Sequence, residues 1–167
     1  LTALTLAKTL VNYKINVDLF FFKKNFKIDE SRTIGIARNN INFFNNNIIN
    51  IDKIIWKLKR IEIFSDKLKK DKLINFKANE DYLFSIVKNN KLYQLLKKDL
   101  SKNKFFKSKF SNKRNISFLD NYELIINCDS SNLITNRYFS KKIIKKYNSH
   151  AYTTIIKHDQ ILNDTAF

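Results

Sequence analysis

One segment of the sequence has residue types and a spacing that suit ligand binding. In LIINCDSSN (124–132) an apolar run ends in a polar turn that contains Asp129. A buried strand that stops at an acidic residue is typical of a site where a carboxylate meets a phosphate or a sugar. Such turns usually carry glycine, because no Cβ then obstructs the ligand, whereas Ser130 and Ser131 follow here. Asp129 is therefore a candidate ligand-binding residue, and the alternative is that it caps a helix beginning near Ser131.

The other residue types that bind metals or act as nucleophiles give no further site. Cys128 is the only cysteine, so we expect neither a disulfide framework nor a cysteine-based metal site. His150 and His158 have no plausible ligand partners nearby in the sequence, and we interpret them as surface or strand histidines. We therefore predict no catalytic residue and no metal site from the sequence.

The charge of the chain allows two interpretations. The formal net charge is +17, which suits an anionic partner such as nucleic acid or a membrane surface. Lys, Asn, Ile and Phe are all abundant, however, as expected of a chain encoded by AT-rich DNA. Lysine far exceeds arginine, and bidentate recognition of bases or phosphates favours arginine.

No apolar run reaches the ~18 residues needed to span a bilayer, and the first residues do not resemble a signal peptide; we expect a cytoplasmic protein.

The elements that would position Asp129 follow from the hydrophobic pattern. LTALTLAKTLVNY (1–13) has apolar residues at helical spacing, and KINVDLFFF (14–22) is a nearly continuous apolar strand. Helix, turn and strand in this order form the second half of a βαβ unit. We expect Lys14–Phe22 and Tyr122–Ile126 in one buried, mainly parallel sheet.

The rest of the chain predicts short alternating elements. Residues 30–47 suggest an extended segment and then a short helix, and Ile61 and Ile63 alternate with Arg60 and Glu62 as in a half-buried strand. We expect Ile61–Phe64 and His150–Lys157 in a separate sheet. Further strands are predicted at 72–76, 82–87, 104–110 and 115–119, and helices at 89–100 and 131–139, the former capped by Asn89 or Asn90. The Lys-rich runs 69–77 and 141–147 suggest solvated faces, or alternatively contacts to an anionic surface.

Taken together, several segments resemble the flavin-dependent aromatic-ring hydroxylases of ubiquinone biosynthesis, which are class A flavoprotein monooxygenases with the para-hydroxybenzoate hydroxylase type of fold. ESRTIGIA (30–37) is similar to the family's Asp-[Ser/Gly/Ala]-Arg-x-Ile-Ala-[Leu/Ile] segment, and VKNNKLYQLL (87–96) to its V-x-N-x-x-L-x-x-x-L segment. LIINCDSSN is similar to L-[IV]-[IV]-[GA]-[AC]-D-G-x-[NH]-S, and residues 150–167 resemble the strand that opens the substrate-domain sheet. The resemblance covers essentially the whole chain.

The resemblance implies an α/β fold. A partial Rossmann-like FAD-binding domain with a mainly parallel sheet would cover 1–58 and 88–142, interleaved with parts of an antiparallel substrate-domain sheet at 59–87 and 143–167. The implied activity is hydroxylation of a polyprenylated phenol, with NAD(P)H as the reductant of FAD. Arg32 would contact the flavin cofactor, and Asp129 would lie near its pyrophosphate and the path of the reduced nicotinamide. The alternative for Arg32 is an ordinary surface arginine.

The sequence also departs from the family pattern. The glycine-rich loop is absent, Phe21 stands where the family has a ribose-binding carboxylate, and Ser130 stands where it has glycine. We therefore expect a fragment of such a monooxygenase that is inactive as an isolated chain, cytoplasmic or peripheral to the inner membrane. Two alternatives are a basic nucleic-acid-binding module and a non-enzymatic interaction protein built on a degraded hydroxylase scaffold.

Overall fold

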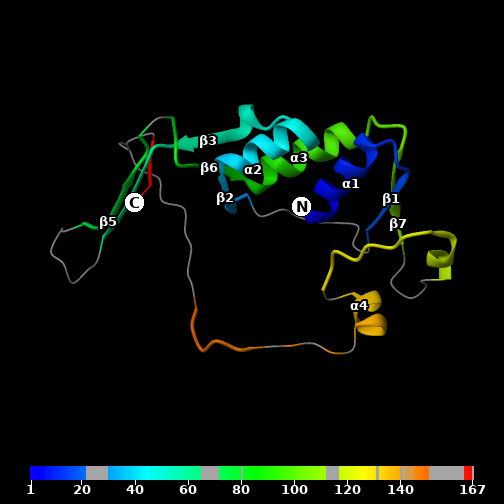
Figure 1. Cartoon of the computed structure of the whole chain (residues 1–167). Helices are drawn as coiled ribbons and strands as arrows, with labels where there is room; N and C mark the ends of the chain where they lie inside the picture. Colours follow the sequence, from blue (N-terminus) through cyan, green and yellow to red (C-terminus); the bar gives the residue numbers. More distant parts are fainter. Residues whose placement is uncertain are drawn as a thin grey trace.

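The protein has a mixed α/β fold, seen in a computed structural model (Figure 1). The structure describes residues 1–21, 30–64, 72–79, 81–111, 117–130, 132–139, 141, 143, 145–150 and 164–166. Its elements are α1 (Thr2–Asn12), β1 (Val17–Phe21), β2 (Thr33–Ala37), α2 (Arg38–Phe43), a π-helical turn (Phe44–Ile48), a 3-10 turn (Asp52–Ile54), β3 (Ile55–Leu58), β4 (Arg60–Phe64), β5 (Lys72–Lys77), β6 (Phe84–Lys88), α3 (Asn89–Leu100), β7 (Phe106–Phe110), a 3-10 turn (Ser117–Asn121), α4 (Leu133–Tyr138) and β8 (Thr165–Ala166).

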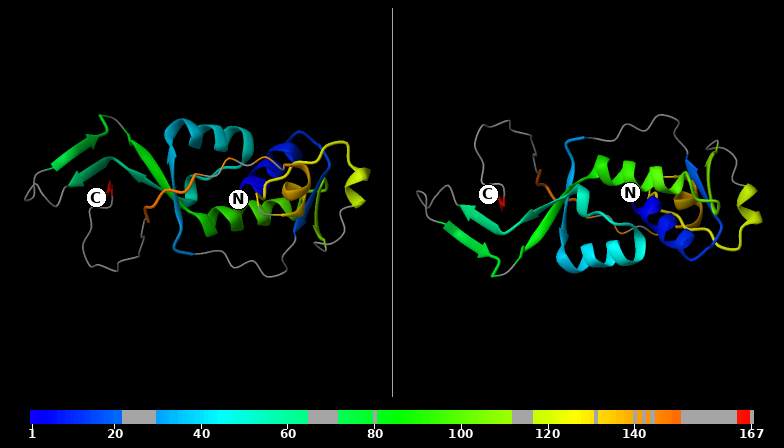
Figure 2. Two further views of the ribbon diagram at one scale, coloured as in Figure 1. Left: turned by 90° about the horizontal axis from the view of Figure 1, so that it is seen from below. Right: turned by 90° about the horizontal axis from the view of Figure 1, so that it is seen from above.

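The described strands form three small sheets. One is parallel and consists of β1 and β7, with Val17 opposite Phe106 and Phe21 opposite Phe110. The second is antiparallel, in the order β2-β6-β3. The third has the order β5-β4-β8, with β5 antiparallel and β8 parallel to β4. Figures 1 and 2 show this third sheet projecting beyond the layer formed by α1, α2 and α3.

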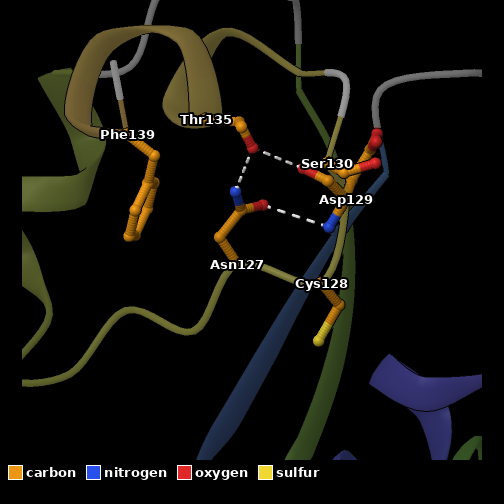
Figure 3. A pocket seen from close by; sticks show the side chains of 6 residues that line it. All are labelled: Asn127, Cys128, Asp129, Ser130, Thr135 and Phe139. Carbon is orange, nitrogen blue, oxygen red and sulfur yellow. Dashed lines mark hydrogen bonds between the residues drawn. The ribbon is translucent and has the colours of Figure 1, made fainter. Parts of the chain in front are cut away.

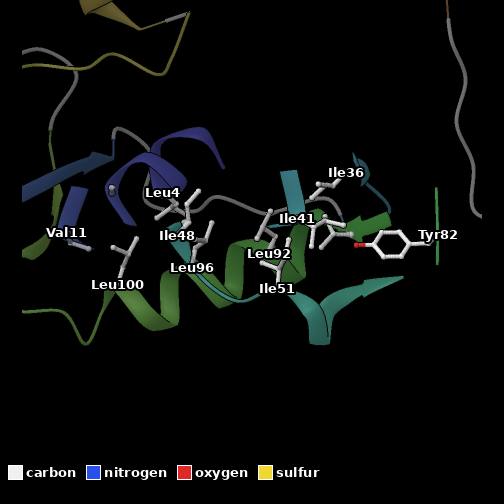
Figure 4. Packing of buried hydrophobic residues seen from close by; sticks show 12 residues of the cluster. Leu4, Val11, Ile36, Ile41, Ile48, Ile51, Tyr82, Leu92, Leu96 and Leu100 are labelled. Atoms are coloured by element: carbon white, nitrogen blue, oxygen red, sulfur yellow. The ribbon is translucent and has the colours of Figure 1, made fainter. Parts of the chain in front are cut away.

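The core lies between the helices (Figure 4). The buried side chains of α1 and α3 recur every three or four residues, which is the spacing of one helix face. They are Leu4, Ala7 and Val11 from α1, and Leu92, Leu96 and Leu100 from α3. The same cluster also contains Ile36, Ile41, Ile48, Ile51, Tyr82 and Val87. Full burial of a leucine contributes about 1.5–3 kcal/mol, so this contact is a main source of stability.

Several expectations from the sequence are confirmed. The first helix and the following strand form as α1 and β1, the extended segment and short helix form as β2 and α2, and the helix at 89–100 forms as α3. The strand at 104–110 and the short helix at 131–139 form as β7 and α4. Lys88, rather than Asn89 or Asn90, is the N-cap residue of α3, and it makes no side-chain capping bond.

The expectation for Tyr122–Ile126 is wrong. These residues form no strand, and the side chains of Leu124, Ile125 and Ile126 are 74%, 45% and 49% exposed. The parallel partner of β1 is β7 instead. A strand persists only where a neighbouring strand satisfies its backbone groups, and no described strand pairs with this run. The strand expected at 115–119 is also wrong, since Ser117–Asn121 forms a 3-10 turn.

The strand β4 forms as expected, but the burial of its side chains does not follow the predicted alternation. Glu62 is buried at 5% exposure, whereas Ile63 and Phe64 are 42% and 44% exposed. Ion pairs explain the burial of Glu62, because its carboxylate lies 2.6 Å from the Nζ of Lys72 and 3.6 Å from Arg60. As expected, β4 belongs to a different sheet from β1. His150 is exposed, and residues 151–157 lie outside the described residues.

The turn between α1 and β1 contains a strained residue. Lys14 has a φ of 61°, in the left-handed region, whereas Gly35 lies in β2 without a positive φ. The Lys14 amide donates to Val11 O at 3.0 Å, which closes the end of α1. A residue with a Cβ is disfavoured in this conformation by roughly 1–2 kcal/mol.

We therefore predict that Lys14→Gly stabilises the protein by about 0.5–1 kcal/mol, since glycine relieves the strain but loses more backbone entropy on folding. Urea unfolding followed by circular dichroism measures the change. Lys14→Ala is the matched control, because it removes the lysine chain but keeps the Cβ, and it should give no such gain. Equal stabilisation by alanine and glycine would show that the Cβ is not the cause.

Candidate functional site

The residue predicted from the sequence, Asp129, lines an open pocket of about 350 Å³. The lining comes from the loop at 127–130 and from α4, and consists of Asn127, Cys128, Asp129, Ser130, Thr135 and Phe139 (Figure 3). Cys128, Asp129 and Ser130 are exposed, whereas Thr135 is buried at 7% exposure. The loop thus presents three polar side chains to solvent above a buried hydroxyl.

Asn127 organises this loop. Its Nδ2 donates to the hydroxyl of Thr135 at 2.6 Å, and its Oδ1 accepts from the backbone amide of Asp129 at 3.2 Å and from the side chain of Asn132 at 2.8 Å. The Thr135 hydroxyl in turn donates to the carbonyl of Asp129 at 2.6 Å. The polar atoms between the loop and α4 therefore satisfy one another, which fixes the conformation around Asp129.

The cap of α4 is Asn132 and not Asp129. The Oδ1 of Asn132 accepts a hydrogen bond from the backbone amide of Thr135 at 2.9 Å. An N-cap side chain reaches the amide two or three residues later, and Thr135 lies three residues after Asn132 but six after Asp129. The alternative interpretation of Asp129 as the cap of this helix is therefore wrong.

Arg32 is not among the residues that line this pocket. It is exposed and lies just before β2, where its carbonyl accepts a hydrogen bond from the amide of Asn89, the first residue of α3, at 2.9 Å. The sheet that contains β2 lies at the start of α3, whereas β7 follows the end of α3 (Figure 1). The structure thus does not bring Arg32 and Asp129 into one pocket.

A polar cluster connects the segment that leads to the pocket with the parallel sheet. The carboxylate of Asp18 accepts hydrogen bonds from the hydroxyl of Tyr122 and the ammonium of Lys109, each at 2.5 Å. The rings of Phe20 and Tyr122 meet edge to face with centroids 5.7 Å apart. These contacts hold the start of the 122–127 segment against β1 and β7.

The hydrogen bonds of this cluster shift three pKa values. Desolvation of the Asp18 carboxyl opposes its ionisation, but the hydrogen bonds from Lys109 and Tyr122 outweigh it, so the pKa of Asp18 lies below its ordinary value of 3.8. The hydrogen bond to Asp18 raises the pKa of Lys109 above 10.5. The same carboxylate raises the pKa of Tyr122 above 10.0, since it accepts the phenolic proton and disfavours the phenolate.

Sequence reasoning missed most residues that build this site. Asn is a preferred N-cap residue, and Asn132 directly before the apolar pair Leu133 and Ile134 is the signal that could have identified the cap of α4. Asn127 gave no signal, because its partners are set by the path of the loop. Asp18 and Lys109 are 91 residues apart, and no local pattern joins them.

No protein-family model and no curated protein matches the sequence. Within the described part of the chain, no three His, Cys, Asp or Glu residues are grouped so that they could hold a metal ion. No helix among the described residues is both long enough and apolar enough to cross a bilayer. The polar loop and its pocket remain the candidate site, because the pocket contains the residue predicted from the sequence, Asp129.

The Asp18 cluster predicts a defined pH dependence. The lowered pKa of Asp18 gives stability that is present above about 3.8 and is lost as the pH falls through the lower folded-state value. The raised pKa values of Lys109 and Tyr122 give stability that is present below about 10 and is lost at higher pH. Asp18→Asn should therefore cost about 1 kcal/mol between pH 5 and 9, and less outside this range.

Urea titrations from about pH 3 to about pH 11 measure the effect, because the cost should fall only at the two ends of this range. Asp120→Asn is the control, because Asp120 is exposed in the neighbouring 3-10 turn, and it should change stability little at any pH. A cost of Asp18→Asn that does not vary with pH would contradict the assigned ion pair.

A second prediction concerns the hydrogen bonds of Asn127. Asn127→Ala removes three hydrogen bonds of the loop, so amide hydrogen exchange of residues 129–135 should quicken by about tenfold, which corresponds to about 1.4 kcal/mol. Asn127→Asp keeps the acceptor for the Asp129 amide and should preserve more of its protection. The assignment fails if both variants exchange at the wild-type rate in this segment.

Proposed function

We propose that this chain forms part of the FAD-binding domain of a flavin-dependent aromatic-ring hydroxylase of ubiquinone biosynthesis. One observation carries the proposal: α1 leads through a tight turn into β1, α3 leads into β7, and β1 pairs in parallel with β7. Two helix–strand units that share a parallel sheet are the repeated element of Rossmann-like domains. Asp129 in a pocket near this sheet supports the proposal further.

The division of the sheets is compatible with a second, substrate-binding domain at 59–87 and 143–167. Strand β4 follows β3 after a single residue, Lys59, yet β3 pairs with β6 and β4 pairs with β5 and β8. Strand β6 would connect the two domains, since most of it falls within 59–87 while its partners are β2 and β3. In this proposal the substrate is a polyprenylated phenol, NAD(P)H is the reductant, and the protein is cytoplasmic or peripheral to the inner membrane.

The described residues do not form a complete site for FAD. Arg32 and Asp129 do not line the same pocket. The network of Asn127 uses the polar atoms beside Asp129 internally. Phe21 ends β1 without a side-chain acceptor, and an unpaired ribose hydroxyl costs on the order of 1–3 kcal/mol. We therefore expect weak, reversible flavin binding by this chain and derive no reaction step from it.

A titration of FAD fluorescence with the purified chain tests the proposal. We expect saturable quenching at low salt but no flavin retained after gel filtration. Asp129→Ala and Arg32→Ala should each weaken binding by about two- to fivefold, since one exposed charged contact contributes less than about 1 kcal/mol. Arg38→Ala, a change to another exposed arginine, is the matched control.

Two results would contradict this proposal. The absence of saturable quenching would remove the flavin function, as would unchanged affinity in both the Asp129 and the Arg32 variants. Stoichiometric flavin that survives gel filtration would instead contradict the incomplete site, because it would require a pocket that the described residues do not form.

Single-stranded nucleic-acid binding is a second candidate. Tyr138 and Tyr147 are 61% and 69% exposed, and Arg137 and Lys145 lie 5.6 Å and 5.1 Å from their ring centroids. Exposed aromatic rings beside cations are the elements on which bases stack. Salt-dependent binding of an oligonucleotide that Tyr138→Ala and Tyr147→Ala weaken, with no effect on flavin quenching, would favour this candidate over the hydroxylase.

A further inference from the structure

Strand β5 (Lys72–Lys77) is an open edge of the third sheet. Because the order of this sheet is β5-β4-β8, no described strand pairs with the outer side of β5. The sheet projects beyond the helices (Figures 1 and 2), and every residue of β5 is exposed. An open edge presents unpaired backbone donors and acceptors to which another strand can bind.

The hydrogen bonds of β4 show which residues of β5 face this edge. The amide of Arg60 donates to the carbonyl of Asp164, beside β8, at 3.0 Å, so the backbone groups of Arg60 point away from β5. Those of the next residue, Ile61, point toward β5, where Phe76 lies opposite. Since the backbone groups of successive residues point to opposite sides of a strand, the N–H and C=O of Asn75 face the open edge.

The exposed side chains of β5 suit an added strand better than a flat partner. Leu73, Ile74 and Phe76 are 58%, 36% and 55% exposed. Ile74 and Phe76 point to one face and Leu73 points to the other, because side chains alternate along a strand. A flat surface covers only one face of a sheet, whereas a strand added at the edge contacts side chains on both faces. The partner that this edge fits is therefore an extended strand.

We propose that β5 pairs antiparallel with β5 of a second copy of this chain, across a two-fold axis that joins two third sheets into one. An axis at Asn75 places Asn75 opposite its own copy, and places Ile74 of each chain opposite Phe76 of the other. An isoleucine opposite an aromatic ring is a favourable cross-strand pair, and the symmetry forms this pair twice. The backbone groups of the two Asn75 residues then bind one another.

The positions of the lysines agree with this register. In the proposed dimer Lys77 lies opposite Leu73 and Lys72 lies opposite Ala78, so no lysine of β5 faces another lysine. The ammonium of Lys72 is already bound by the carboxylate of Glu62 at 2.6 Å. The net charge of +17 on each copy still opposes association, so pairing should strengthen as salt screens this repulsion. Binding to nucleic acid weakens with salt instead.

Sedimentation equilibrium of the purified chain tests this pairing without any flavin. A dimer should form with a dissociation constant of about 10–100 μM, because a short strand contact buries less than about 1,200 Å², and it should tighten at high salt. Asn75→Pro removes the amide at the open edge, where proline spares the β4–β5 ladder, and it should weaken the dimer by at least about tenfold. Asn75→Ala is the matched control, because it keeps the amide, and its affinity should stay within about threefold of wild type.

Cross-linking keeps the test decisive if circular dichroism shows that the proline variant does not fold. In a Cys128→Ser background, Asn75→Cys places two thiols on opposed residues whose Cα atoms lie about 5.5 Å apart, within the range of a disulfide. Lys77→Cys is the matched control, because its two copies lie about 14 Å apart along the ladder. Oxidation by air should link the first variant into dimers and leave the second unlinked.

Three results would overturn the proposal. One is a wild-type chain that stays monomeric at about tenfold above the expected dissociation constant, as expected of an edge that pairs with a different protein. Another is a folded Asn75→Pro variant that dimerises like wild type. The third is a Lys77→Cys variant that cross-links as readily as Asn75→Cys, because association would then not depend on this register.

Discussion

The packing of α1 against α3 is the contact on which the rest of the described structure depends. Leu4, Ala7 and Val11 face Leu92, Leu96 and Leu100, and Leu96 and Leu100 have no exposed surface. Because α1 runs into β1 and α3 runs into β7 through short turns, the placement of the two helices also fixes where the two strands start. The amide of Val17 donates to the carbonyl of Phe105 at 2.8 Å, so the parallel sheet begins where the turns end.

Asparagine side chains then fix the turns at the edge of this core. The side chain of Asn12 donates to the carbonyls of Asn47 and Ile48, each at 2.9 Å, and joins the end of α1 to the π-helical turn. Asn127 and Asn132 do the same for the loop and α4. A chain with one glycine and no proline thus uses asparagine amides to satisfy the backbone at several turns. The same amides occupy the positions where a ligand would otherwise find free donors, which is why the pocket at Asp129 is ordered but offers little to a phosphate.

The third sheet and the pocket at Asp129 differ in which side chains are exposed to solvent. At the pocket, polar groups are paired internally and the loop is fixed. On the third sheet, the charged Glu62 is paired internally and the apolar side chains remain open. A surface of the second kind gains free energy only when a partner removes it from water.

The sequence by itself determined the helices and most of the strands, because their signal is local. The apolar spacing of α1 and α3 and the continuous apolar character of β1 needed no partner to be recognised. Tertiary structure decided which strands pair: β1 pairs with β7 and not with Tyr122–Ile126. A run such as Leu124–Ile126 has the composition of a buried strand, but only a neighbouring ladder makes it one. The burial of Glu62 and the pairing of Asp18 with Lys109 likewise depend on residues 10 and 91 positions away, and charge pairing over such separations leaves no periodic signal in the sequence.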